Sequence, residues 1–263
     1  MKFQLILNKL KVLRMHYQKI GFVNLFGYII QRIFKQKAKI IKINIPTYLN
    51  PVYLRNTESD TQIFTHIFLR EELKIQLIEN PWVIIDGGAN IGLGTLYLRN
   101  NYPDALIIAV EPDRSNFEML VKNTKPYKNI ICYNSGLWNK NAKLKIVNKD
   151  AGNESFIVSE LNDFDPMDDS IEAITISEII KRNSITKVDL LKLDIEGSEK
   201  KIFENNYSDW LSITENILIE IHNWIQPDAE KTVMNAIAHD FKNKMAGEYH
   251  FFYRTNEKVC WDL

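Results

Sequence analysis

Two groups of side chains that could do chemistry each follow an apolar run. The first is the glycine-rich stretch Asp86-Gly-Gly-Ala-Asn-Ile-Gly92, where glycines let the backbone turn tightly and approach a ligand closely. The second comprises Asp194 and Glu196 after one apolar run, and Glu220 and His222 after another. Carboxylates and imidazoles can accept a proton near neutral pH when their surroundings tune them. The sequence therefore predicts a ligand-binding loop and a group for proton transfer.

A further acid, Glu111, closes the next apolar run, 23 residues after Gly88. At this place a carboxylate can accept hydrogen bonds from both hydroxyls of a ribose. The loop does not meet the dinucleotide fingerprint G-x-G-x-x-G. Its pattern D-x-G-x-N-x-G is similar to the loop of S-adenosylmethionine-dependent methyltransferases. Asp86 could then receive the cofactor's ammonium, directly or through water, and loop amides could hold its carboxylate. An NAD-linked oxidoreductase is the alternative, because NAD enzymes also use an acid at this position.

The elements that must position these groups alternate between strands and helices. Such alternation predicts an α/β fold with a doubly wound, mostly parallel sheet, whose ligand lies at the carboxyl ends of the strands. Asp113 and the Thr57-to-Asp60 segment are expected helix caps. The expected strands are 82–86, 105–110, 130–133, 188–193 and 216–221. The expected helices are 93–101, the one capped by Asp113, 176–181, 199–203 and 228–241, before a C-terminal antiparallel hairpin of 249–253 and 258–261.

The segment 139–174 is irregular and acidic, and it predicts a hairpin with a surface loop. Asn153 and Ser155 in it are candidates for the acceptor pocket. The adenine is expected near Asn134 to Leu137, at the end of the third strand. Trp138 and Trp224 fit a core position and a rim position equally well.

Charge divides the chain into two regions. Residues 1–57 contain 11 Lys and Arg and no Asp or Glu, although the net charge of the whole chain is zero. Apolar residues between Phe3 and Ile20 recur at helical spacing, with basic residues off that stripe. We therefore expect N-terminal helices in a basic amphipathic extension, 1–50, and a catalytic domain, 51–263. The extension either packs on the body or contacts an anionic membrane surface.

Composition excludes several classes of protein. Two cysteines cannot form a disulfide framework, and a reducing cytosol fits best. The longest apolar stretch, 20–30, is too short to span a bilayer, and the N-terminus lacks the pattern of a signal peptide. We expect a cytoplasmic protein with a small-molecule, sugar or lipid-linked acceptor, peripheral at the inner membrane surface if the extension binds lipid. The acidic body disfavours nucleic acid.

The chain resembles the FkbM-type methyltransferases over roughly residues 52–224. The matching pieces are D-G-G-A-N-I-G, Val110-Glu-Pro112, Leu191-Lys-Leu-Asp-Ile-Glu-Gly-Ser-Glu199 and Ile219-Glu-Ile-His222. One departure is Thr175-Ile-Ser177, which lacks the acid of the family's T-L-D and puts a capping role in doubt. The resemblance implies a Rossmann-like class I methyltransferase fold. It also implies O-methylation of hydroxyl groups, often on sugars or natural products, without a required metal.

These arguments select a set of site residues. His222 is expected to remove the acceptor's proton, with Asp194 orienting it and Glu220 as another base. Glu196 and Glu199 have a structural alternative, favouring a helix N-terminus by charge. The residues expected to bind S-adenosylmethionine are Asp86, Gly88, Asn90, Gly92, Glu111, Pro112 and Asn134. We expect no metal. The alternatives to an O-methyltransferase acting on a sugar, glycolipid or natural product are the oxidoreductase and a non-catalytic binding module.

Overall fold

The computed structural model describes residues 40–75, 77, 80–147, 157–162 and 170–254. The chain divides into two compact units, Met1–Glu72 and Leu73–Leu263, which we describe separately. Three predictions lie outside the described residues: the basic amphipathic helix, the roles of Asn153 and Ser155, and the strand 258–261.

The first unit contains a β-hairpin followed by a helix. β1 (Ile40–Ile43) pairs antiparallel with β2 (Val52–Arg55). α2 (Glu58–Phe64) follows and continues directly into the π-helical segment η1 (Thr65–Leu69). Both strands place alternate apolar side chains in the interior, as expected for a ribbon with one buried face.

The hairpin and α2 are tied together by polar contacts. The Thr57 side chain accepts a hydrogen bond from the Asp60 amide, which confirms the predicted cap. Asp60 is completely buried, and its carboxylate accepts from the Arg55 guanidinium at 2.8 Å. We expected the N-terminal extension to end at residue 50. The hairpin and this ion pair instead group β2 and α2 with the preceding segment, in the unit that ends at Glu72.

The second unit contains the main sheet, with strand order β12-β13-β11-β10-β3-β4-β5. β13 runs antiparallel to both neighbours, and the other neighbouring pairs are parallel. The chain runs outward from β3 to β5 and then returns to β10 on the other side of β3, so the order reverses between β3 and β10. The strands are β3 (Val83–Gly87), β4 (Leu106–Val110), β5 (Ile130–Tyr133), β10 (Leu190–Leu193), β11 (Asn216–Ile219), β12 (Phe241–Ala246) and β13 (Tyr249–Arg254).

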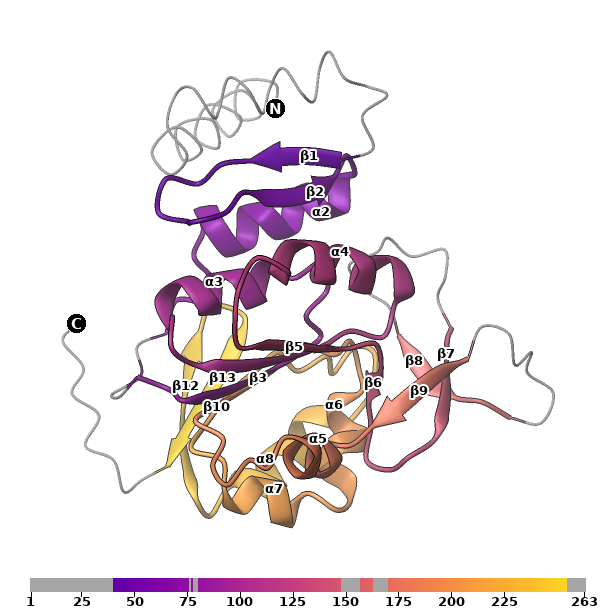
Figure 1. Ribbon diagram of the computed structural model, residues 1–263. Coiled ribbons are helices and arrows are strands. Elements are labelled where there is room, and N and C mark those ends of the chain that lie inside the picture. The colour runs from indigo at the N-terminus through magenta and orange to yellow at the C-terminus, as the bar shows by residue number, and fades with distance from the viewer. Residues whose placement is uncertain (1–39, 76, 78–79, 148–156, 163–169, 255–263) are drawn as a thin grey trace, which may run out of the picture. The chain divides into compact units, whose positions relative to one another are not determined.

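Helices cover both faces of this sheet, which confirms the doubly wound α/β fold (Figure 1). α3 (Leu93–Asn101) and α4 (Arg114–Thr124) lie on one face. The other face carries α5 (Ile176–Arg182), α6 (Glu199–Glu204), α7 (Ser208–Ser212) and α8 (Ala229–Ile237). The two best-defined caps are Asp113, which accepts from the Asn116 amide, and Thr175, which accepts from the Glu178 amide. Thr175 thus caps α5 without the acid that the family pattern places after it.

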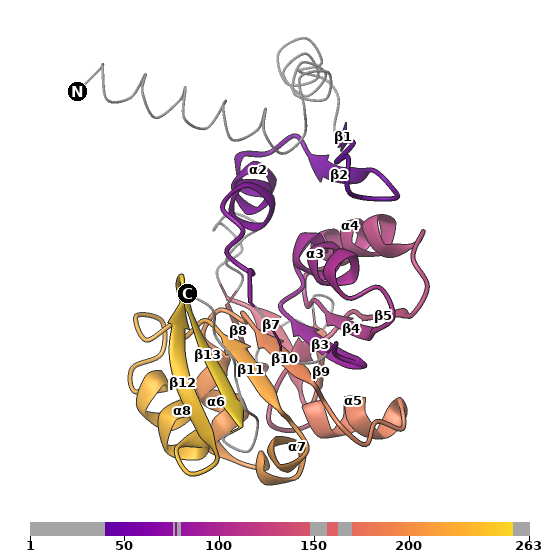
Figure 2. The same cartoon turned by 90° about the vertical axis from the view of Figure 1, so that its left-hand side faces the viewer.

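One strand of the predicted C-terminal hairpin, 249–253, is confirmed by β13, and the other, 258–261, lies outside the described residues. The described residues contain a further antiparallel hairpin. It is formed by β12 and β13, at the edge of the sheet beside α8 (Figure 2). The turn contains Gly247 at φ +65°, a conformation that glycine adopts easily. The helix predicted over 228–241 is shorter in the structure. α8 ends at Ile237, and residues from Phe241 onward form β12.

The segment expected to be irregular forms a small sheet of order β6-β9-β7-β8. Trp138 follows its first strand and is a core residue, 5% exposed, whose indole donates to Glu160 at 2.9 Å. Within the described part of the chain, no helix is long and apolar enough to cross a membrane. The strands of the small sheet are β6 (Gly136–Leu137), β7 (Lys143–Ile146), β8 (Val158–Glu160) and β9 (Ile171–Ile174).

Candidate active site

The loop after β3 is held tightly against the neighbouring strand ends. Gly88 has φ +73°, and a Cβ atom there would overlap the carbonyl oxygen of Asp194 after β10. The amides of Gly88 and Ala89 both donate to the Val110 carbonyl at the end of β4, at 3.0 Å. Glycine is therefore required at position 88 for backbone conformation and for space. The loop joins the ends of β3, β4 and β10.

The other loop amides also have acceptors inside the protein. The Asn90 amide donates to Glu111 Oε2 at 2.8 Å, and the Gly92 amide to the Ala89 carbonyl at 2.8 Å. The Ile91 amide donates to Asn90 Oδ1 at 2.7 Å. Each of these amides is thus paired inside the protein, and the expectation that they hold the cofactor's carboxylate stays a prediction. Asn90 and Gly88 remain half-buried and line the surface of the loop.

Asp86 anchors the loop from below. It is completely buried, and its carboxylate accepts a hydrogen bond from the Thr95 hydroxyl at 2.6 Å. The ammonium of Lys192 lies 3.3 Å from Asp86 Oδ1. The expectation that Asp86 receives the cofactor's ammonium, directly or through water, stays a prediction. Asp86 fixes the start of α3 and the position of Lys192.

Glu111 closes β4 and bonds to the two segments that flank it. Its carboxylate accepts from the amides of Asn90 and Asp113, at 2.8 and 2.9 Å, and from the Asn116 side chain at 3.4 Å. Burial raises the pKa of Glu111 to about 7, against the lowering effect of those amides. A carboxylate can accept about four hydrogen bonds, so capacity remains for a ribose hydroxyl.

Pro112 and Asn134 lie on the same side of the loop, and both are half-buried. The Asn134 side chain donates to the carbonyls of Glu111 and Pro112, at 2.9 and 3.0 Å. These bonds join the residues that follow β4 and β5. The amide group of Asn134 is thus used to build the pocket wall where we expected the adenine.

The second group of candidate residues meets at the ends of β10 and β11, as predicted from their parallel pairing. His222 Nε2 lies 3.4 Å from Glu196, 3.7 Å from Glu220 and 3.9 Å from Asp194. On the other side of the ring, His222 Nδ1 lies 2.9 Å from Glu199 Oε1. Glu196 (φ +50°) belongs to a turn with left-handed backbone, and such conformations concentrate at functional sites.

His222 is the buried centre of this cluster, with a side chain only 5% exposed. Burial by itself lowers the pKa of the imidazole, but the hydrogen bond and charge of Glu199, together with Glu196 and Asp194, raise it to about 9. His222 is therefore protonated at neutral pH. A protonated imidazole cannot accept a proton, which removes the basis for choosing His222 as the base.

Glu220 and Asp194 are more accessible than His222, with side chains 28% and 26% exposed. Burial and the charge of Asp194 together raise the pKa of Glu220 to about 7, against the lowering effect of His222. Asp194 accepts a hydrogen bond from the Tyr249 hydroxyl at 2.9 Å and lies 3.7 Å from Lys192 Nζ. A molecule entering the site can thus reach the two carboxylates, with the imidazolium behind them.

Sequence reasoning missed the roles of Lys192 and Tyr249. Lys192 is 4% exposed on β10 and donates to the Gly88 carbonyl at 3.1 Å. Burial lowers its pKa, but Asp86, Asp194 and Glu220 together raise it, so Lys192 stays charged. A lysine inside the apolar run Leu190-Leu-Lys-Leu193 was a visible signal. Tyr249 offered none, because β13 brings it to Asp194 from 55 residues away.

Metal binding is a geometric alternative for the same residues. Asp194, Glu220 and His222 each offer one ligand atom, and these atoms lie within 4.8 Å of one another. However, Lys192 already supplies a positive charge 3.7 Å from the Asp194 carboxylate. The arrangement agrees better with a network for proton transfer.

The polar groups on the β3 to β5 side fit a nucleoside better than a phosphate. Glu111 presents a carboxylate, which suits ribose hydroxyls and repels phosphate. The loop amides that would cradle a phosphate are paired internally. The strand order, the glycine loop and this carboxylate together define a Rossmann-like methyltransferase that uses S-adenosylmethionine.

The chain belongs to the FkbM family of methyltransferases, because the family pattern described as methyltransferase FkbM domain matches residues 86–249. This match confirms the resemblance seen in the motifs and sets the oxidoreductase and the binding module aside. It covers the glycine loop, Glu111, the cluster around His222 and Tyr249.

Named relatives agree with the family. "Methyltransferase 1" of Beauveria bassiana (strain ARSEF 2860) is 24% identical over 194 residues, which cover 66% of this chain and 77% of that protein. "Methyltransferase sdnD" of Sordaria araneosa is 24% identical over 195 residues, covering 62% and 74%. The crystal structure of methyltransferase FkbM from Methylobacillus flagellatus KT aligns with a TM-score of 0.48 and 15% identity. That alignment covers 72% of this chain and 48% of that one, about half its length.

Proposed function

We propose that this methyltransferase acts on a hydroxyl group of a sugar, glycolipid or natural product. The observation that carries the proposal is the pair of accessible carboxylates, Asp194 and Glu220, around a buried imidazolium at the carboxyl edge of the sheet. An alcohol is a weak nucleophile while it keeps its proton, so its methylation benefits from a base at the site. This cluster supplies one.

The β3 to β5 side of the edge is proposed to hold the cofactor. When bound, S-adenosylmethionine supplies a methyl group on a positively charged sulfur. Glu111 would accept hydrogen bonds from the ribose, and the surface of Gly88, Asn90, Pro112 and Asn134 would enclose the nucleoside. The amides in the first turn of α3 lack intrahelical partners by geometry, and they are suited to the cofactor's carboxylate.

We assign proton removal to Glu220. Its carboxylate is accessible, and a base whose pKa lies near the working pH is the most effective. Asp194, which is held by Tyr249 and Lys192, would orient the acceptor hydroxyl. His222 would stay protonated and keep the surrounding carboxylates together. This replaces our sequence-based assignment of His222 as the base.

The test is transfer of a labelled methyl group from the cofactor to a panel of glycosides, glycolipids and hydroxylated natural products. We expect label in an ether linkage to an acceptor oxygen, identified by mass spectrometry and NMR. Label found on nitrogen or carbon would overturn O-methylation while leaving the methyltransferase class intact. Nucleic acids serve as the negative control acceptors, because the carboxylate cluster repels phosphates.

We further propose that residues 1–42, with ten basic and no acidic side chains, contact an anionic membrane surface near a lipid-linked acceptor. Each well-placed basic residue contributes about 1 kcal/mol at such a surface. The full chain should sediment with anionic vesicles and be released by salt. Equal binding to neutral and anionic vesicles, or binding to neither, would overturn this proposal and favour the alternative, in which the extension packs on the catalytic domain.

A further inference from the structure

We propose that Trp224 is the stacking platform for an uncharged sugar ring of the acceptor. Its side chain is 75% exposed, and it follows His222 by two residues in the connection between β11 and α8. The indole meets the His222 ring edge-on, with 6.1 Å between ring centroids and 69° between the planes. An exposed aromatic ring therefore stands directly beside the proposed proton-transfer cluster. This inference rests on the proposed function and adds a contact residue to it.

The turn that carries Trp224 is held by hydrogen bonds and packing. The amides of Ile225 and Gln226 both donate to the His222 carbonyl at 3.0 Å. Ile225 packs on Gly197, where a Cβ atom would lie 2.6 Å from the Ile225 side chain. Gly197 follows Glu196 in the turn after β10. The backbone of Trp224 is thus fixed to both strand ends of the site, so its indole is presented with little loss of chain entropy on binding.

The surroundings of Trp224 point to a sugar as the occupant. A hollow of about 540 Å³ is lined by Asn223, the residue before Trp224 in the chain, and by Asp228, Glu230, Lys231 and Met234. Asn223 and Glu230 bond to each other, with the Asn223 amide donating to Glu230 Oε2 at 3.1 Å. A pyranose has an apolar C–H face that packs on an aromatic ring, and a rim of hydroxyls that pairs with amides and carboxylates.

Charge narrows the choice further. In the hollow, the acids Asp228 and Glu230 outnumber the positive Lys231. A sugar carrying a phosphate or carboxylate next to its ring would meet this negative potential, so an uncharged glycoside is favoured.

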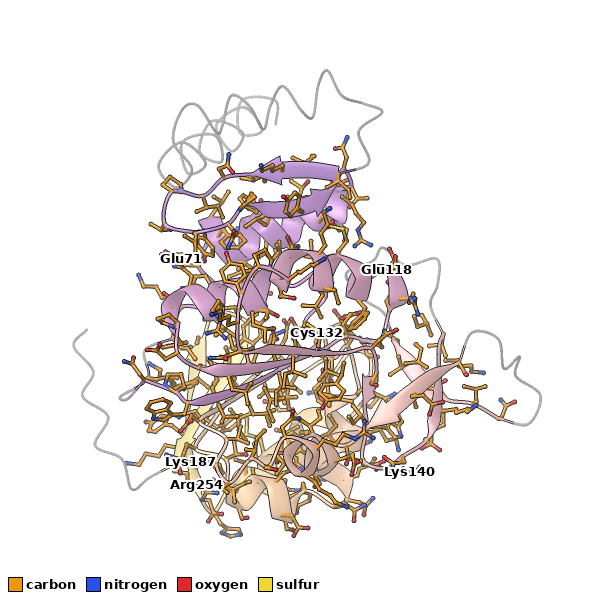
Figure 3. All side chains as sticks on the ribbon, in the orientation of Figure 1. Glu71, Glu118, Cys132, Lys140, Lys187 and Arg254 are labelled. Atoms are coloured by element: carbon orange, nitrogen blue, oxygen red, sulfur yellow. The ribbon has the colours of Figure 1, made fainter. Side chains whose placement is uncertain are left out.

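Trp82 provides a matched control. It is 72% exposed, but it precedes β3 and so lies at the amino ends of the parallel strands, opposite to the proposed site. Lys187 and Arg254 mark that opposite edge in Figure 3. The experiment compares wild type, Trp224→Phe, Trp224→Ala and Trp82→Ala. The probes are methyl glucopyranoside, methyl galactopyranoside, methyl mannopyranoside and the acyclic polyol sorbitol. Methyl transfer from labelled cofactor is measured together with saturation-transfer NMR of ring protons.

We expect wild type to methylate at least one glycoside in preference to sorbitol. Trp224→Ala should raise the KM for that glycoside about ten-fold, the equivalent of about 1.4 kcal/mol, while kcat, cofactor affinity and Tm stay near wild type. Trp224→Phe should retain most of the affinity, and Trp82→Ala should match wild type. Saturation transfer to the C–H protons of one ring face should disappear in Trp224→Ala.

Unchanged KM in Trp224→Ala would overturn the platform and leave O-methylation standing. If wild type neither methylates nor binds any glycoside but methylates a hydroxylated lipid or polyketide, the platform is again overturned and the proposed function survives. If no hydroxyl acceptor is methylated while the cofactor binds, both the Trp224 platform and the proposed O-methylation are overturned.

Discussion

The two halves of the sheet's carboxyl edge use polar side chains in different ways. At the ends of β3, β4 and β5, Asp86, Glu111 and Asn134 bond mainly to backbone groups, hydroxyls or amides nearby. At the ends of β10 and β11, the side chains of Asp194, Glu196, Glu220 and His222 face one another. We call these the cofactor half and the acceptor half.

The cofactor half is built for rigidity, whereas the acceptor half is built for reactivity. In the cofactor half, Asp86, Glu111 and Asn134 each hydrogen-bond to fixed protein groups, and these bonds hold the strand ends in place. In the acceptor half, like charges are brought together against their mutual repulsion and are held by Lys192 and His222. Crowded carboxylates shift one another's proton affinity, which is the condition for a base that works near neutral pH. The following predictions test this division.

The largest expected effect is on turnover in the acceptor half. Glu220→Gln should reduce kcat by about 10² to 10⁴-fold because it removes the base, while cofactor affinity by calorimetry stays near wild type. Asp194→Asn should also lose most turnover. Glu215→Gln, just before the other end of β11, is the matched control. Near-normal turnover in Glu220→Gln would show that another group accepts the proton.

Cofactor affinity tests the cofactor half. Glu111→Ala should weaken binding of S-adenosylmethionine and of its demethylated product by about 2 to 4 kcal/mol, roughly thirty-fold or more, because charge-assisted hydrogen bonds to the ribose are lost. Glu118→Ala, an exposed acid on the neighbouring helix α4 (Figure 3), is the control. Equal calorimetric affinity in a folded Glu111→Ala protein would remove the ribose assignment.

The pH dependence of kcat/KM distinguishes Glu220 from His222. A base must be deprotonated, so activity should rise about ten-fold per pH unit below its pKa and level off above it. With Glu220 as the base, the rise should end near pH 7, where its pKa lies. With His222 as the base, it should continue toward pH 9. A profile still rising at pH 8 would favour the histidine.

The smallest expected effect is that of chelation. We expect EDTA to leave turnover unchanged, because Lys192 and the protonated His222 supply the positive charge in the acceptor half. The comparison is between enzyme treated with EDTA and the same enzyme after addition of Mg²⁺ or Mn²⁺. Loss of turnover that one of these ions restores would identify Asp194, Glu220 and His222 as metal ligands.

The cofactor half could largely be predicted from local sequence. A short apolar run, a glycine turn and an acid at the end of the next apolar run are signals that act over a few residues, and β3, β4 and α3 lie close to the predicted ranges. Caps such as Asp113 are equally local. The hairpin of β12 and β13 was missed because periodicity could not show that the chain turns at Gly247, and the predicted helix ran on into β12.

The sequence by itself determined the fold class, the family, the cofactor and the residue types at the strand ends, because these depend on local pattern and on strands that run parallel. Only the tertiary structure decided what those residues contact and how deeply they are buried. Glu199 and Tyr249 reach the site through packing and strand order, across 23 and 55 residues. Asp86 is completely buried, and the carboxylates around His222 raise the pKa of its imidazole to about 9 against the lowering effect of burial. A pKa depends on distances to charges and on exposure to water, and neither is written in the order of the residues.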